Sequence, residues 1–320
     1  MQLLLRRALH SLVLLVSASV LSFVLVDLAP GDFFDAMRMN PQITPKTIAS
    51  MRSQYGLNRP LPIRYLRWVA SAATGDWGVS FAYNSPAGPI VWARAQNTLL
   101  LAGSATLMAW LIAIPAGICA AARPGSWIDL FISGTTASLM AIPELVLAIV
   151  LLLFAVRTRC LPSAGMTSVN FSLIDPAAKI RDVLAHLVLP GFCLTAGLLP
   201  LLLAHVRTAV AEVLQSSFVA AAGGYGISFW RILVCQALPA AANPLISLFG
   251  VSIGLLTSSS LIVEVIFSWP GLGQLMLEAI LQRDFFVIVD VSLLATAFVI
   301  LGNAIGDLLL YAIDPRVRQA

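Results

Sequence analysis

The sequence predicts an all-α membrane protein, a polytopic chain with about six transmembrane helices. Hydrophobic residues make up 59% of the 320 residues and charged residues only 11%, and the mean hydropathy is +0.91. Soluble domains contain roughly 45–50% apolar and about 25% charged residues. Uncharged apolar runs also recur along the chain, each near the roughly 20 residues that a helix needs to cross the hydrocarbon. One membrane-embedded domain is therefore favoured over two soluble domains.

The charges and the cysteines argue against two other classes of protein. The formal net charge is +4, and the basic residues, almost all arginine, are scattered without a basic run. Nucleic acid is therefore not an expected partner. The four cysteines lie more than thirty residues apart with no CxxC pair, so we expect packing residues and neither a disulfide framework nor a metal site. They are Cys119, Cys160, Cys193 and Cys235.

The first predicted span comprises residues 8–26, which carry no charge and directly follow Arg6 and Arg7. A secretory signal peptide is the alternative, because basic residues also precede its apolar region. The uncharged run of 19 residues exceeds a typical signal core of about 7–15 residues. We therefore expect a retained transmembrane helix within an N-terminal segment, residues 1–30.

Residues 31–96 differ from the spans on either side. The segment is polar, rich in proline and arginine, and contains "YGLNRPLPIRYLRWVASAATGDWGVSF". Its aromatic and turn-forming residues predict a folded cap of short helices outside the membrane, and not a linker.

Five further spans are expected in the rest of the chain, residues 97–320. Six spans place both termini on one side of the membrane. Arginine counts do not choose that side, because the positive-inside rule discounts the long first loop, while the second polar connection at 157–186 carries four basic residues. The predicted spans are 98–121, 127–156, 187–205, 240–263 and 287–311.

Residues 206–238 form an unusual connection between two of these spans. The segment begins as an amphipathic helix, and Gly223, Gly224 and Gly226 then favour a helix end and a bend. A second short helix is predicted through Trp230 to Pro239. Small residues let another surface approach the backbone closely, so this pair of helices is expected to contact a partner. A flexible connector is the alternative.

Two acidic residues fall inside predicted spans. Glu144 follows Pro143, which is expected to kink or break the helix, and Asp290 lies on the last span. A carboxylate at that depth is costly and usually faces a cavity or a partner, so both are candidate translocation-pathway residues. For Glu144, the alternatives are a hydrogen bond to backbone freed by Pro143, or a misplaced span.

The sequence lacks the motifs of a catalytic site. No lysine directly follows a glycine, which excludes a phosphate-binding GxxxxGK[ST] loop. HExxH does not occur, and no serine sits in a recognisable hydrolase arrangement. We expect no enzyme activity, no catalytic residue and no metal in this chain. An ion-coupled secondary transporter that uses Glu144 or Asp290 as a proton site, and a membrane scaffold, are the alternatives from other classes.

The stretch "FVAAAGGYGISFWRILVCQALP" resembles the EAA loop of binding-protein-dependent ABC importer permeases, whose pattern is EAA-x3-G-x9-I-x-LP. Ala221, Ala222, Gly226, Leu238 and Pro239 match it. The loop's usual charges are replaced here, and the residues at those positions are Ala220, Gly223 and Tyr225.

Other blocks are similar to one subgroup, the first permease of dipeptide, oligopeptide and nickel importers. With the EAA-like stretch they occur in the subgroup's order and cover nearly the whole chain. They are "LAPGDFF" (28–34), "YGLNRPLPIRYLRWV" with "GDWGVSF" (55–81), "LPSAGM" (161–166), "EVIFSWPGLGQLMLEAILQRDFFVI" (264–288) and "YAIDPRVR" (311–318).

The resemblance implies the type I ABC importer permease fold and a set of partners. These are a second permease subunit in a heterodimer, two ATPase subunits and an extracytoplasmic solute-binding protein, around a chain that sits in the lipid bilayer. The subunit itself carries no cofactor, because ATP and Mg are bound by the ATPases. It implies an inner-membrane protein with cytoplasmic termini that imports di- or oligopeptides, with nickel or another small solute as the alternative.

The resemblance also implies where the partners bind. The loop 206–238 is expected to dock on an ATPase from the cytoplasm, and the extracytoplasmic cap, with 157–186 and 264–286, to face the solute-binding protein. The ATPase-coupling candidates are Phe218, Ala221, Ala222, Gly226, Leu238 and Pro239. The receptor-facing candidates are Tyr65, Trp68, Trp77 and Phe81.

Overall fold

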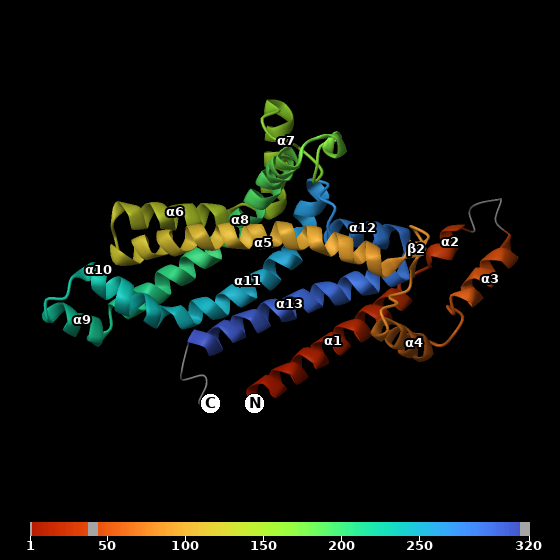
Figure 1. Cartoon of the computed structure of the whole chain (residues 1–320), viewed down its shortest axis with the longest axis horizontal. Coiled ribbons are helices and arrows are strands. Elements are labelled where there is room, and N and C mark those ends of the chain that lie inside the picture. Colours follow the sequence, from red (N-terminus) through yellow and green to blue (C-terminus); the bar gives the residue numbers. More distant parts are fainter. Residues whose placement is uncertain (1, 38–43, 314–320) are drawn as a thin grey trace. The chain divides into compact units, whose positions relative to one another are not determined.

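The computed structural model describes residues 2–37 and 44–313, which are almost entirely helical (Figure 1). This confirms the all-α class, with one two-stranded hairpin added. In chain order the elements are α1 (Gln2–Leu28), α2 (Phe33–Met37), α3 (Pro45–Gln54), α4 (Leu61–Ala73), β1 (Val79–Ser80), β2 (Ser85–Pro86), α5 (Ala87–Ala122), α6 (Trp127–Ala141), α7 (Glu144–Thr158), η1 (Phe171–Leu173), α8 (Pro176–Leu214), α9 (Ser217–Gly224), α10 (Phe229–Ile232), the π-helical turn η2 (Leu233–Ala237), α11 (Leu238–Ile266), α12 (Leu272–Gln282) and α13 (Phe285–Ile313).

The described residues include five helical stretches that are long and apolar enough to cross a membrane, or six if the bent pair α6 and α7 forms one span. The predicted span 127–156 is not one straight helix, because α6 and α7 meet at an angle of 94°, and the predicted kink or break at Pro143 is present. Pro143 has no N–H to continue the helix, and it pushes the residue before it out of the helical region. Ile142 is accordingly extended, with φ −93° and ψ 115°.

Several helices are longer than the predicted spans. α5 begins at Ala87, inside the predicted cap, and α8 has 39 residues. Hydropathy marks only the part of a helix that suits lipid, whereas backbone hydrogen bonding continues into the polar flanks.

The chain divides into two compact units, and the first comprises Met1–Thr98 with Pro270–Ala297. Its core is an aromatic cluster built on Phe23 of α1, Trp68 of α4 and Phe285 of α13. Ser80, at the β1–β2 hairpin, donates its hydroxyl proton to Asp284, 2.5 Å away. The short helices predicted for the cap are present as α2, α3 and α4, segment 270–297 belongs to the same unit, and the place of the cap outside the membrane stays a prediction.

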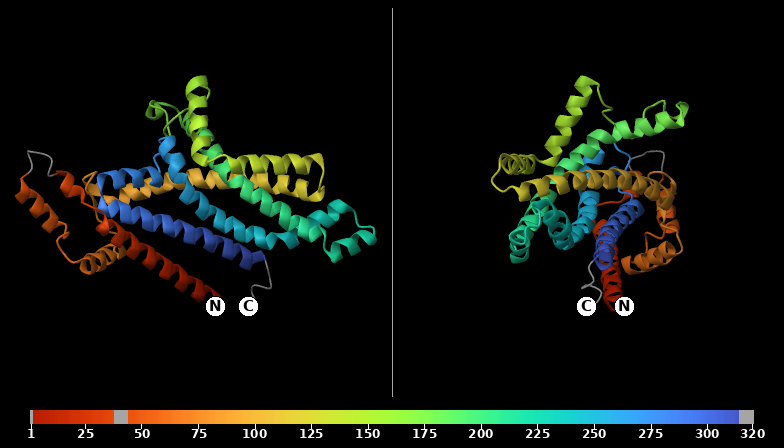
Figure 2. Two further views of the ribbon diagram at one scale, coloured as in Figure 1. Left: turned by 180° about the vertical axis from the view of Figure 1, so that it is seen from behind. Right: turned by 60° about the vertical axis from the view of Figure 1, so that its left-hand side comes forward.

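The second unit comprises Leu99–Trp269 with Phe298–Ala320. Within it α8 packs against α6, α7 and α11, around a hydrophobic core that includes Leu194, Leu202 and Val206 of α8. α11 and α13 approach each other closely where glycines face each other. A Cβ on Gly302 would lie only 2.8 Å from the Gly250 carbonyl oxygen. α9 and α10 lie at one end of α8 and α11 (Figure 2).

Candidate functional site

α9 and α10 form a bent helix pair because Gly226 ends the first helix. The Gly226 N–H donates to the Gly223 carbonyl over 3.0 Å, and the Ile227 N–H donates to the Ala222 carbonyl over 3.3 Å. Both bonds satisfy carbonyl groups at the helix end, and they require that the residue after the helix adopt the left-handed backbone conformation. Gly226 has φ +78°, which glycine adopts without strain. The predicted bend at Gly226 is confirmed.

The surface of this bent pair is apolar and exposed. Only Arg231 is charged between residues 217 and 237. Phe218 is 47% exposed, and no atom lies within 4 Å of a Cβ placed on Gly226. The other exposed aromatic side chains of the pair are Tyr225, Phe229 and Trp230. A clustered apolar surface of this kind is typical of an interaction site.

The six coupling candidates divide by exposure. Ala221 and Pro239 are exposed, as Phe218 and Gly226 are, and Leu238 is half-buried. Ala222 is only 8% exposed. Its side chain is covered by its own chain in this conformation, and its part in coupling stays a prediction. On a single short helix, adjacent residues point in directions about 100° apart, so both alanines cannot face one partner equally.

An ion pair joins the base of α8, just before the bent pair, to α6. Arg207 donates from Nε to Asp129 Oδ1 over 2.7 Å and from Nη2 to Oδ2 over 3.0 Å. The Gly125 N–H donates to the same carboxylate over 2.9 Å. Asp129 is 5% exposed, so this bidentate contact fixes the two helices in register. Sequence reasoning missed it, because the partners lie 78 residues apart.

Glu144 is the first residue of α7 and lines a cavity of about 400 Å³. The cavity is formed by α6, α7, α8 and α11, and Leu147, Leu194 and Leu256 are among its apolar lining residues. Glu144 Oε1 is buried and accepts no hydrogen bond. The structure therefore does not place this oxygen in a hydrogen bond to backbone freed by Pro143, which was one of the alternatives.

Asp290 lies in the other unit, on the first turns of α13, and is fully buried. Neither of its carboxylate oxygens has a hydrogen-bond partner. The indole Nε1 of Trp68 is likewise buried without a hydrogen-bond partner among the described residues. Asp290 faces packed side chains in this conformation, so its assignment to a pathway stays a prediction.

The four receptor-facing candidates are largely packed into the first unit. Trp68 is 5% exposed and its ring lies 5.8 Å from that of Phe23, so it is covered in this conformation and its contact with a receptor stays a prediction. Tyr65, Trp77 and Phe81 are half-buried. The apolar face of α4 turns the rings of Tyr65 and Trp68 toward the core, because burying them removes a large apolar area from water.

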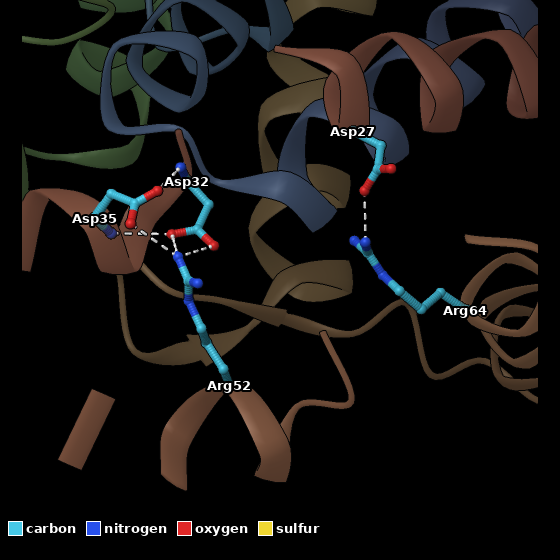
Figure 3. A network of polar contacts seen from close by, with 5 residues as sticks. All are labelled: Asp27, Asp32, Asp35, Arg52 and Arg64. Atoms are coloured by element: carbon cyan, nitrogen blue, oxygen red, sulfur yellow. Dashed lines mark hydrogen bonds and ion pairs between the residues drawn. The ribbon is translucent and has the colours of Figure 1, made fainter. Parts of the chain in front are cut away.

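A charged network at the end of α1 organises the cap and was not foreseen (Figure 3). Arg52 of α3 donates to Asp32 over 2.7 Å and to Asp35 over 2.9 Å. Arg64 of α4 donates to Asp27 of α1 over 2.5 Å. The hydrogen bond from Arg52 to Asp32 raises the pKa of the guanidinium above its ordinary value. α4 is thus tied to the end of α1, and α3 is tied to α2 and to the turn before it.

Together, these features define a class of protein: a multi-span helical membrane protein that presents an exposed apolar helix pair and has no nucleotide-binding loop. Residues 113–319 match a family described as "Binding-protein-dependent transport system inner membrane component". Residues 1–96 match the N-terminal membrane component of the same transport systems. The chain belongs to this family, and is the permease subunit of a binding-protein-dependent ABC importer.

The relatives match over their full length. The oligopeptide transport system permease protein AppB of Bacillus subtilis (strain 168) is 34% identical, with 98% of each chain covered. The dipeptide permease DppB of Escherichia coli (strain K12) is 29% identical over 95% of each. The di/tripeptide permease DppB of Pseudomonas aeruginosa (strain UCBPP-PA14) is 30% identical over 94% of each.

A solved structure supports the fold. The inward-facing MetNI methionine ABC transporter contains a chain that superposes with a TM-score of 0.57 at 20% identity, covering 70% of this chain and 96% of that one. The predicted importer permease fold is confirmed. The protein is a multi-pass inner-membrane subunit without its own ATPase site, and its ATPase partners bind the ATP.

Proposed function

We propose that this permease imports peptides. The observation that carries the proposal is the full-length similarity to permeases named for oligopeptide, dipeptide and di/tripeptide transport. Because these relatives differ in the length of peptide that they are named for, the proposal extends to short peptides as a class.

The proposed assembly pairs this chain with a different second permease, above two ATPase subunits. Both termini and the bent pair α9–α10 lie in the cytoplasm, and the cap faces the solute-binding protein outside. The exposed apolar surface of α9 and α10 supports the docking role. ATP binding closes the ATPase dimer, and the bent pair carries that movement to the transmembrane helices, which alternate between outward-facing and inward-facing states.

Glu144 and Asp290 are retained as proposed pathway residues. The cavity beside Glu144 supports its role, whereas Asp290 would need a conformation in which its side chain is uncovered.

Reconstitution tests this function. The chain would be purified with its second permease and ATPases, placed in proteoliposomes, and supplied with the solute-binding protein and radiolabelled tri-alanine. We expect uptake that requires ATP, and no ATP hydrolysis by this chain when it is purified alone. ATP-driven uptake of nickel without peptide uptake would overturn the peptide assignment, and uptake that persists without ATP would indicate an ion-coupled transporter.

A further inference from the structure

The cavity beside Glu144 has one ionisable group in an otherwise apolar lining. No lysine, arginine or histidine side chain is among the residues that line it. Ser259 supplies the other polar side chain, and the rest is aliphatic side chain, glycine and proline. With a volume of about 400 Å³, the cavity falls in the range of small-molecule sites, roughly 300–1,000 Å³.

The carboxylate of Glu144 faces this space without a partner. Its Oε1 atom is buried and unpaired, and a buried polar group without a hydrogen bond costs free energy. Gly197 leaves the space beside Oε1 open, whereas a Cβ at this position would be in van der Waals contact with Oε1, 3.8 Å away. A hydrogen-bond donor that enters the cavity and pairs with Oε1 would therefore remove this free-energy cost.

The end of α6 at the cavity favours a positively charged guest. Glu144 is the first residue of α7, where the positive end of the helix dipole partly offsets the cost of burying its carboxylate as an anion. Leu139 and Met140 come from the last turn of α6, where carbonyl groups lack intrahelical partners and the dipole is negative. A calcium or magnesium ion would need about six oxygen ligands, more than one carboxylate and one hydroxyl provide.

We propose that Glu144 binds the ammonium group of the transported substrate, which for a peptide is the free amino terminus. The ammonium donates to the Glu144 carboxylate, and the first side chains of the peptide lie against the apolar lining. The inference rests on the proposed function as a peptide importer and adds the substrate group that the cavity recognises.

Equilibrium dialysis tests the inference on the assembled permease–ATPase complex without the solute-binding protein. The probes are radiolabelled tri-alanine and N-acetyl-tri-alanine, which lacks the ammonium. We expect the wild type to bind the free-amine peptide about tenfold or more tightly than the acetylated one, as for a charge-assisted hydrogen bond. Glu144→Gln, which is nearly isosteric, is expected to abolish this preference, and Glu144→Asp to retain part of it.

The outcomes separate this inference from the function on which it rests. Equal binding of the two peptides by the wild type, or an unchanged preference in Glu144→Gln, would overturn the ammonium site even where ATP-driven peptide uptake is observed. Weakened binding of both peptides to the same extent in Glu144→Gln would assign Glu144 a structural role and also overturn it. Failure of ATP-driven peptide uptake by the wild type would instead overturn the proposed function.

Discussion

At the scale of single residues, Gly226 is held in a backbone conformation that residues with a Cβ rarely adopt, at φ +78°. Gly226→Val is expected to strain the bend by about 1–3 kcal/mol. The bent pair would then change shape, and pull-down of the ATPase subunits by the permease should fall together with transport.

The matched control for this change is Gly75→Val. Gly75 also has positive φ, and a Cβ placed on it would have no atom within 4 Å, but it lies in the cap. It should carry similar strain and leave ATPase binding intact. Equal loss of ATPase binding in both variants would mean that strain anywhere in the chain, and not the bent pair, causes the defect.

Ala221 and Ala222 are expected to respond differently to the same substitution. Ala221→Glu adds a charge on the exposed face of α9 and should weaken ATPase binding without changing the unfolding temperature. Ala222 is 8% exposed, so Ala222→Glu buries a charge in its own chain, which costs several kcal/mol, and should lower the unfolding temperature. The two quantities would be measured by pull-down and by thermal unfolding in detergent. Identical effects would contradict the assigned orientation of α9.

At the scale of elements, the Arg207–Asp129 ion pair connects α8 with α6. Arg207→Met leaves the buried Asp129 carboxylate with fewer donors, and we expect a loss of roughly 1–3 kcal/mol in the free energy of unfolding. Combining it with Asp129→Asn should cost less than the sum of the single changes, because the unpaired charge is removed as well. A double-mutant cycle measures the coupling, and strictly additive effects would show that the pair contributes nothing.

Replacing glycine by alanine is expected to have opposite effects on stability at Gly302, in the contact between α11 and α13, and at Gly103 on α5. Gly302→Ala places a methyl group 2.8 Å from the Gly250 carbonyl oxygen, so the helices must separate and the unfolding temperature should fall. Gly103, on α5, has open space around it, with no atom within 4 Å of where a Cβ would lie. Gly103→Ala should therefore stabilise its helix by about 0.5–1 kcal/mol. A fall in the unfolding temperature with Gly103→Ala as well would remove the steric explanation.

At the scale of the whole molecule, the cap is proposed to receive the solute-binding protein. Its aromatic candidates are largely packed inside, so the exposed side of α4 is the better target. Leu66 is 66% exposed, and Leu66→Gln should raise the receptor concentration that half-maximally stimulates ATP hydrolysis by several-fold to about tenfold. Basal hydrolysis without receptor should stay unchanged. Unaltered stimulation in variants along α4 would favour a cap that only covers the translocation opening.

The membrane class, the approximate spans, the short helices that follow α1 and the bend at Gly226 follow from the sequence alone. These are local properties: hydropathy, helix-breaking residues and glycine's backbone freedom act over a few to about twenty neighbouring positions. The order of the motif-like blocks also indicated the family, because each block is contiguous in the chain. The break at Pro143 was foreseen as a kink, but its angle of 94° depends on how α7 packs on α8.

Only the tertiary structure decided which side chains are available to partners and which pair with each other. Ala222 and Trp68 looked like contact residues and are buried, because the elements that pack over a residue, and not its type alone, decide whether its side chain is covered. The ion pair of Arg207 with Asp129 and the hydrogen bond of Ser80 with Asp284 join residues 78 and 204 positions apart. The cavity that isolates the Glu144 carboxylate exists only where four helices meet, since a cavity is a property of packed surfaces and no local pattern encodes it.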